Sequence, residues 1–398
     1  MIFEDIIRKH IGSLDLDLRK KPEGFSRYMD QKVTPDVLTF IADCIVNFLG
    51  GKESSVVFTT KELWDFQYFQ KNTVAIFGKP SPTNESASAE YDKFIAQPLK
   101  TLAFAKILKE EKVGVRNTYK VLQPEILEYI AQNERNAWIF LVVYVEKVLT
   151  DSGFGELESY RDKAKAGTVS QRDFEVLKTK FEAFMRGFTN INGGTEIRRI
   201  FPKVLNPYAV YHMINGSEDG RMTENRFAYS DLMYNRSNFR DIGKDKAITR
   251  QESEEIIEEN PELSAYKVQK AKNIIRRNHT ASEVRDSYAN GEATQVHHIF
   301  PEHEFPQISV YVENLILLTP QQHNTKAHPS NHTQIIDRPY QRECLLSKID
   351  TIESSLKQGK DIYSKESLIH VINTGLSLDL STNTTFDELR AKVNELYI

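Results

Sequence analysis

The sequence predicts a helix-rich α+β protein with more than one domain. Its 398 residues exceed the length at which a single hydrophobic core is usual. Apolar residues recur at helical spacing through most of the chain, whereas strand-like runs are short and few. The hydrophobic and charged fractions, 40% and 27%, are ordinary for a soluble globular protein. We therefore expect helices to form most of each core, with small sheets packed among them.

Three regions follow from the order of these patterns, at residues 1–133, 134–263 and 264–398. The first combines helices with a basic pair of strands. The second is predicted to be helical, with an interruption near Gly153 and Gly155. The third holds a cluster of histidines and ends in amphipathic helices. We expect each region to fold as a domain.

Local signals place helices in the first region. Thr59, followed three residues later by Glu62, matches a capping box at a helix start. A later stretch carries apolar residues at helical spacing, and Pro98 is expected to break that helix or to mark its first turn. The sequence thus predicts helices before the strands of this region.

A basic hairpin follows at residues 112–121, where strand-forming residues surround a turn expected at Arg116-Asn117. Six basic and two acidic residues lie between Lys100 and Lys120, a balance that suits phosphates. The order helix, helix, basic hairpin resembles winged-helix DNA-binding domains. This resemblance makes the first region a winged-helix-like domain and Arg116 a candidate DNA contact. The alternative is an ordinary α+β packing unit whose lysines are simply solvated.

Arginines elsewhere are further candidates, although the net charge of −4 means that any positive surface must be local. Arg198 and Arg199 follow a Gly-Gly turn and could hold phosphates or read guanine edges from Arg-rich loops. Arg236 has aromatic neighbours and the same two possible roles. Structural ion pairs with nearby acids are the alternative at all three positions. Arg276 and Arg277 belong to a basic helix that precedes the histidines and could guide DNA towards them.

The histidines are unusually crowded, since six of the ten lie between His297 and His332. Residues 296–300 form a short apolar run that holds the first two of them. A loop with two prolines follows, and residues 314–319 form a second apolar run of strand length. The sequence therefore predicts two short strands joined by a loop.

A helix should follow the second strand at once. Thr319 is a good N-cap, Pro320 suits the first helical position and Gln322 completes a capping box. His323 would then lie just past the first helical turn, and Pro329 would end the helix.

The order strand, loop, strand, helix resembles the HNH, or ββα-metal, nucleases. The matching residues are His297 and His298 on the first strand, Asn314 at the second strand and His323 on the helix. The stretch LLTPQQH is similar to the colicin-type DNase branch, and the two cysteines are too isolated to form a zinc knuckle. A long chain with a DNA-binding-like region upstream of such a module resembles an HNH-type restriction endonuclease.

The resemblance implies a role for each matching residue. His298 would deprotonate the attacking water, since imidazole titrates near neutral pH. His297 and His323 would bind the metal, and Asn314 would brace the loop that orients the base. His328 is a doubtful third ligand because it lies on a different helix face from His323. Neighbours on a strand point to opposite sides, so His297 and His298 can share a site only where the strand ends or bulges.

These roles imply a metal-dependent DNA endonuclease that leaves 5′-phosphate and 3′-hydroxyl ends. One divalent ion per active site is expected, with Mg²⁺ favoured over Mn²⁺ or another ion. Because one HNH module cuts one strand, a double-strand break implies a homodimer on double-stranded DNA. A sequence-specific type II restriction enzyme is therefore the predicted function.

Three alternatives stay open. The first is a nonspecific or structure-directed HNH nuclease, such as a defence effector or toxin. The second is a modification-dependent nuclease, which would cut methylated DNA and ignore an unmethylated copy. The third is a DNA-binding regulator with a degenerate HNH fold, which would shift DNA in a gel without cutting it.

Other features disfavour several classes of protein. No GxxxxGK[ST] loop is present, so no nucleotide cofactor is expected. The most apolar run, residues 137–145, is far shorter than the ~20 residues of a membrane span. The N-terminus lacks the pattern of a signal peptide, and the isolated Cys44 and Cys344 suit a reducing compartment. A cytoplasmic protein without membrane partners is the expectation.

Overall fold

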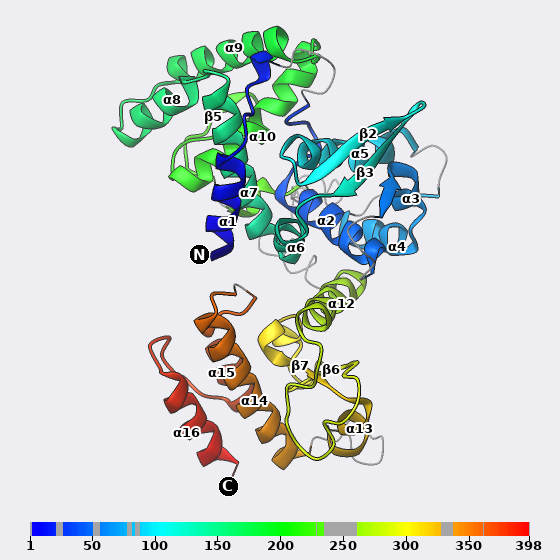
Figure 1. Cartoon of the computed structure of the whole chain (residues 1–398). Helices are drawn as coiled ribbons and strands as arrows, with labels where there is room; N and C mark the ends of the chain where they lie inside the picture. The colour runs from blue at the N-terminus through cyan, green and yellow to red at the C-terminus, as the bar shows by residue number, and fades with distance from the viewer. Residues whose placement is uncertain are drawn as a thin grey trace, which may run out of the picture. The chain divides into compact units, whose positions relative to one another are not determined.

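The part of the chain that the structure describes is helix-rich and holds three small antiparallel sheets (Figure 1). The computed structural model describes residues 2–20, 27–50, 56–77, 82–83, 88–227, 229–234, 261–327, 337–360 and 362–397. The prediction of a helix-rich α+β protein is confirmed for these ranges. None of the helices in them combines the length and the apolar character needed to cross a membrane.

The chain divides into two compact units. One comprises Phe3–Ile256, and the other comprises Ile257–Ile398 together with the first two residues. The regions predicted at 1–133 and 134–263 therefore share the first unit almost entirely, and the predicted histidine region corresponds to the second.

The first unit joins a helical layer to a three-stranded sheet of order β1-β3-β2. Its elements up to residue 132 are α1 (Ile2–Gly12), η1 (Leu18–Lys20), α2 (Pro35–Leu49), β1 (Val57–Thr59), α3 (Thr60–Asp65), α4 (Gln67–Phe77), α5 (Ser88–Phe104), β2 (Leu108–Val113), β3 (Arg116–Val121) and α6 (Pro124–Gln132). The remaining elements are α7 (Glu134–Asp151), α8 (Glu156–Lys165), α9 (Gln171–Phe188), α10 (Gly194–His212), β4 (Ser217–Glu218), β5 (Arg221–Met222) and η3 (Tyr229–Leu232). The interruption predicted near Gly153 and Gly155 is the break between α7 and α8.

The capping box at the start of α3 is confirmed. The Thr59 hydroxyl accepts a hydrogen bond from the Glu62 amide at 3.2 Å, and the Thr59 amide donates to the Glu62 carboxylate at 2.7 Å. Both bonds give a partner to backbone N–H groups that have no acceptor within the helix at its start. The motif depends on residues three apart, which explains why it could be recognised from the sequence.

The break predicted at Pro98 is wrong, because this proline lies inside α5. A proline in a helix interior removes one backbone hydrogen bond and costs roughly 3 kcal/mol. Phe94, Leu99 and Leu102 on the same helix are fully buried. Their burial offsets the local penalty, so that the helix continues through the proline.

The turn of the β2–β3 hairpin lies at Gly114-Val115, and the prediction of a turn at Arg116-Asn117 is wrong. Val113 pairs with Arg116 across the hairpin, which leaves a two-residue loop. Gly114 has a φ of 63°, a conformation that such loops require and that glycine adopts without strain. Arg116 is therefore the first residue of β3, where its side chain is exposed.

The prediction that Arg198 and Arg199 belong to an Arg-rich loop is also wrong. Both lie in the first two turns of α10, which begins directly after Gly193. Ile197 and Ile200 are buried at helical spacing, and this burial holds the segment in a helix. The two arginines are left exposed between those buried positions.

The second unit is built around a two-stranded sheet covered by helices (Figure 1). Its elements are α12 (Pro261–Asn278), β6 (Gln295–His298), η4 (Pro306–Ile308), η5 (Val312–Asn314), β7 (Leu315–Leu318), α13 (Pro320–Gln322), a π-helical turn η6 (His323–Ala327), α14 (Arg338–Lys357), α15 (Lys365–Leu376) and α16 (Phe386–Leu396). The predicted order of strand, loop, strand and helix is therefore confirmed, with slightly shorter strands than expected.

Strand β7 lies at the centre of this unit. All four of its residues are buried, so side chains pack on both faces of the strand. Its antiparallel partner β6 brings His297 opposite Ile316 and His298 opposite Leu315. Apolar side chains of α14 and α15, among them Ile349 and Leu368, belong to the same core. The histidines are thus held on a strand whose partner is fixed by the core.

Candidate functional site

The segment that carries His323 begins with the predicted capping box. The Gln322 amide donates to the Thr319 hydroxyl at 3.1 Å, and the Thr319 amide donates to the Gln322 side-chain oxygen at 3.0 Å. Pro320 occupies the first helical turn, where its missing N–H leaves no donor unpaired. His323 follows directly and starts a π-helical turn. A well-defined start therefore fixes the position from which this imidazole projects.

The rings of His297 and His323 lie against each other. Their centroids are 5.5 Å apart and their planes meet at 81°. Imidazole nitrogens bind divalent ions at about 2.0–2.1 Å, so two rings at this separation are close enough to share one ion. The strand and the helical turn thus bring together the two residues predicted as metal ligands.

His323 also has a polar neighbour that favours one tautomer. Its Nδ1 lies 3.1 Å from the side-chain oxygen of Asn324. If Nδ1–H donates to this oxygen, Nε2 is left with the lone pair that a metal ligand needs. In the described ranges, no group of three or more His, Cys, Asp or Glu side chains is arranged to hold a metal ion. His328, the doubtful third ligand, lies outside those ranges.

His298 is held by a backbone carbonyl. Its Nε2 lies 3.0 Å from the carbonyl oxygen of Ser309. Because a carbonyl can only accept a hydrogen bond, Nε2 must carry the proton and Nδ1 has the free lone pair. This is the form of imidazole that can take a proton from water.

Electrostatics keeps His298 in that neutral form. Burial lowers its pKa, and the positive charge of Lys272 lowers it further. The hydrogen bond to Ser309 and the charge of Glu302 act in the opposite direction but are smaller. The side chain is therefore unprotonated at neutral pH, as a base must be.

The two adjacent histidines have different neighbours. His297 faces the ring of His323, whereas His298 bonds to Ser309 in the loop. Strand β6 ends at His298. The end of the strand is one of the two conditions under which neighbouring side chains can approach a common site, because the alternation of sides holds only along a regular strand.

Asn314 joins the two ends of the loop between the strands. Its side-chain oxygen accepts from the Phe300 amide at 2.8 Å, and its Nδ2 lies 3.0 Å from the Phe300 carbonyl. Nδ2 also lies 3.3 Å from the Ile308 carbonyl, next to Ser309. The side chain is fully buried. These are the contacts that a loop-bracing residue requires, since they hold the backbone next to Ser309, whose carbonyl lies against His298.

The structure brings two further charged residues to this site, one from the predicted basic helix and one that the sequence did not single out. Lys272 on α12 and Glu302 in the loop are close enough to His298 to influence its pKa. Burial lowers the pKa of Lys272 as well, with Glu302 opposing and Arg276 reinforcing the effect. Lys272 and Arg276 are one helical turn apart in the predicted basic helix, so they lie on one face of α12. Ser309 gave no signal, because its backbone and not its side chain acts.

The predicted DNA-contacting arginines fall in both units. Arg276 and Arg277 lie on α12, which packs against the histidine hairpin. Arg116, Arg198 and Arg199 belong to the first unit.

The alternative role of these arginines was structural ion pairing. Within the described ranges neither Arg198 nor Arg199 forms an ion pair with a carboxylate, and Arg198 donates instead to the Gly194 carbonyl at 3.1 Å. Arg236 lies outside these ranges.

Comparison with known proteins identifies no relative of this chain. The chain matches no family model, no curated protein and no solved structure.

Proposed function

We propose that this protein is a metal-dependent DNA endonuclease whose active site lies on the β6–β7 hairpin and the helical turn after it. The observation that carries the proposal is the meeting of His297 and His323, together with the hydrogen bond that holds the neighbouring His298 to Ser309. Strand, loop, strand and helix occur in the order of the HNH nucleases, with Asn314 closing the loop.

His298 would act through Nδ1. The Ser309 carbonyl holds the ring by Nε2–H, so the lone pair of Nδ1 is available to accept a proton from the attacking water. Asn314 would restrict the movement of that carbonyl by bonding to the carbonyl of the preceding residue, Ile308. Both effects orient the base before substrate arrives, which lowers the barrier to proton transfer.

His297 and His323 would hold a divalent cation. When bound, the ion would neutralise charge on the scissile phosphate and stabilise the 3′ leaving oxygen. Two protein ligands leave the remaining coordination positions to water and phosphate oxygens. Such an open site would suit Mg²⁺ better than structural zinc, which takes four protein ligands. The products would carry 5′-phosphate and 3′-hydroxyl ends.

Cations outside the site would bind the DNA backbone. Lys272 and Arg276 form one face of α12 near His298, and Arg277 adds a third charge. In the first unit, the winged-helix-like arrangement of Arg116 on a projecting hairpin would add further contacts. A type II restriction enzyme acting as a homodimer on double-stranded DNA fits this combination, since one site would cut each strand.

The proposal is tested by replacing the base. We expect His298→Ala to reduce the rate of cleavage of phage DNA in Mg²⁺ by at least about 100-fold, because general-base catalysis contributes about 10²- to 10⁴-fold. DNA binding in a gel-shift assay should survive. His303→Ala is the matched control, since the His303 side chain is 53% exposed and lies 3.4 Å from the neighbouring Glu304 carboxylate. Cleavage by His298→Ala at the wild-type rate would show that the base is wrongly assigned.

The same digestion separates the kinds of nuclease. Discrete bands would indicate sequence specificity, a smear would indicate nonspecific cutting, and cutting of methylated DNA alone would indicate modification dependence. Sequencing the ends would give the cut position and the end chemistry.

One observation favours a second function. Only two metal ligands come together in the part of the chain that the structure describes. A DNA-binding regulator with a degenerate HNH fold would need no metal at all. It would shift DNA in a gel, show no cleavage in Mg²⁺ or Mn²⁺, and be unaffected by His298→Ala.

A further inference from the structure

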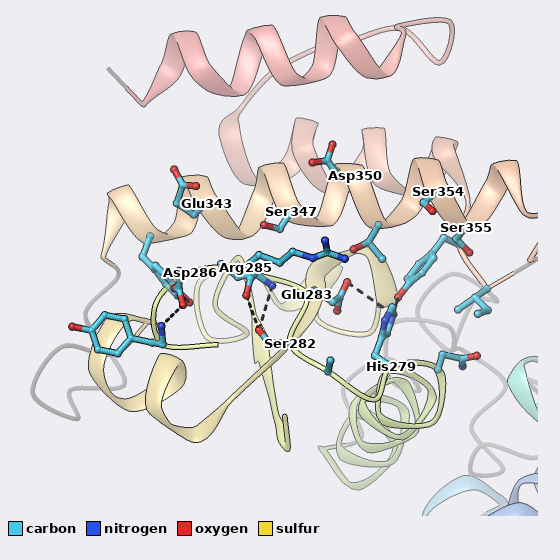
Figure 2. Close-up of a pocket in the computed structure, with 18 of the residues that line it drawn as sticks. His279, Ser282, Glu283, Arg285, Asp286, Glu343, Ser347, Asp350, Ser354 and Ser355 are labelled. Atoms are coloured by element: carbon cyan, nitrogen blue, oxygen red, sulfur yellow. Dashed lines mark hydrogen bonds and ion pairs between the residues drawn. The ribbon is translucent and has the colours of Figure 1, made fainter. Parts of the chain in front are cut away.

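A polar pocket of about 890 Å³ opens in the second unit, between residues 278–288 and helix α14. Lys326 and the residues around Tyr363 complete its wall. Figure 2 shows Arg285 extended along the pocket, with Ser347 on the helix facing it. The volume is that of a small-molecule site. The nuclease proposal makes no use of this pocket.

Most carboxylates around the pocket already have partners. Glu343 pairs with Arg342 at 2.7 Å, and Asp350 pairs with Arg390 at 2.8 Å. Asp286 accepts hydrogen bonds from two side chains and one backbone amide, but it has no cationic partner in the described ranges. Arg390 also pairs with Glu353 and Asp387, so it compensates the charge of Asp350 only in part, while that of Asp286 is not compensated.

The fourth carboxylate, Glu283, is neutralised within the protein. Its side chain is 2% exposed and lies 3.0 Å from the Lys348 ammonium, which is 0% exposed. Lys348 also donates to the Tyr363 hydroxyl at 2.9 Å, and this hydroxyl lies 2.6 Å from Nε2 of His279. Burial lowers the pKa of His279, which favours its neutral form.

The cations at the pocket are not compensated in the same way. Within the described ranges, Arg285, Lys326 and Lys360 line the pocket without an ion pair to any carboxylate. Lys326 instead lies 4.8 Å from the centre of the Tyr288 ring. Three such cations against Asp286 and the partly compensated Asp350 leave the pocket with a small excess of positive charge. This excess is local, because the chain as a whole has a net charge of −4.

We propose that this pocket binds a phosphate-bearing small molecule of nucleotide size. The excess charge selects an anion, and the guanidinium fork of Arg285 and the ammonium of Lys360, which both line the pocket, can bind phosphate oxygens. Ser347 and Thr351, one turn apart on α14, add hydroxyl donors. The ring of Tyr288 offers a flat surface on which the nucleobase of such a ligand can stack.

The size of the pocket argues against a free phosphate ion as its ligand, since such an ion would fill only a small part of about 890 Å³. The mode of binding also differs from that of a P-loop, which cradles phosphates with backbone amides. Side-chain cations take that place here. The expectation of no nucleotide cofactor was based on the missing P-loop and did not consider such a pocket.

Titration calorimetry on the full-length protein without divalent metal tests the proposal. The probes are AMP, adenosine, inorganic phosphate and a short single-stranded oligodeoxynucleotide. We expect saturable binding of AMP, no binding of adenosine and weaker binding of inorganic phosphate. Arg285→Ala and Lys360→Ala should each raise the Kd for AMP by at least about tenfold, since each removes a charge-assisted contact.

Two control variants make the result specific. Lys392→Ala removes a cation on α16 that pairs with Glu395 and does not line the pocket, so it should keep the wild-type Kd. His298→Ala should also keep it, which separates this pocket from the nuclease proposal.

Three results would overturn the proposal. Equal binding of adenosine and AMP would exclude phosphate recognition, and no binding of AMP would exclude the site. Tighter binding of the oligodeoxynucleotide than of AMP, lost in Arg285→Ala, would show instead that a DNA strand occupies the pocket.

Discussion

The two hairpins of this protein, β2–β3 and β6–β7, are built on opposite principles. The first closes with the two-residue loop Gly114-Val115, and the Val115 side chain is 92% exposed. The second encloses residues 299–314 between its strands, and β7 is buried throughout. A tight exposed turn can present charges but cannot hold a reactive group rigidly. A long loop pinned by buried polar contacts can orient an imidazole, because many distant residues restrict its movement.

The largest expected effect concerns the edge of β7, which Glu283 holds by accepting from the Leu317 amide at 2.9 Å. Lys348→Ala would leave the Glu283 carboxylate buried without its cation. We expect the free energy of unfolding to fall by about 3–5 kcal/mol in urea titrations of the full chain, because an unpaired buried charge is strongly unfavourable.

Lys357→Ala is the matched control for that change. It lies on the same helix, but its side chain is 72% exposed where it pairs with Glu353. Its loss should change the free energy of unfolding by less than about 0.5 kcal/mol. Equal effects of the two substitutions would show that the buried pair does not support the hairpin.

The next largest effect should come from Asn314→Ala. The substitution leaves the Phe300 amide and two carbonyls in the loop without their partner. We expect a loss of about 3 kcal/mol in the free energy of unfolding, together with reduced DNA cleavage, because unsatisfied buried groups are costly. Asn117→Ala on the exposed hairpin is the comparison and should cost less than about 0.5 kcal/mol. A stable Asn314→Ala protein with full activity would argue against the bracing role.

A smaller effect is expected at the turn of the exposed hairpin. Gly114→Ala places a side chain at a φ of 63° and should lower the free energy of unfolding by about 1 kcal/mol. No heavy atom lies within 4 Å of the new methyl group, so the loss would come from the backbone alone. DNA cleavage should stay near the wild-type rate per DNA molecule bound. A fall in that rate would mean that the two hairpins act together.

The smallest effect on stability should be that of Arg116→Ala, because Arg116 is exposed. We expect a change of less than about 0.5 kcal/mol in the free energy of unfolding. If this arginine contacts a phosphate, the slope of the logarithm of the DNA-binding constant against the logarithm of the salt concentration should become smaller by about one. An unchanged salt dependence would remove this hairpin from the DNA-binding surface.

The sequence by itself determined those features that depend on a few neighbouring residues. Thr59 with Glu62 and Thr319 with Gln322 form the predicted capping boxes, because each box is closed within one helical turn. The order of strands and helix around the histidines was likewise set by local apolar runs. The turn at Gly114 was also readable locally, since a single glycine supplied the required φ, yet the prediction placed it two residues late.

Only the tertiary structure decided the features that depend on distant residues. The helix continues through Pro98 because Phe94 and Leu99 are buried against other elements. Glu283 and Lys348 lie 65 positions apart, and nothing in either neighbourhood predicts their pairing. The tautomer of His298 likewise depends on a backbone carbonyl, which every residue possesses and no side-chain pattern reveals. Helix caps and tight turns depend on residues a few positions apart. Buried charge pairs and the histidine tautomer depend on which distant atoms the core brings together.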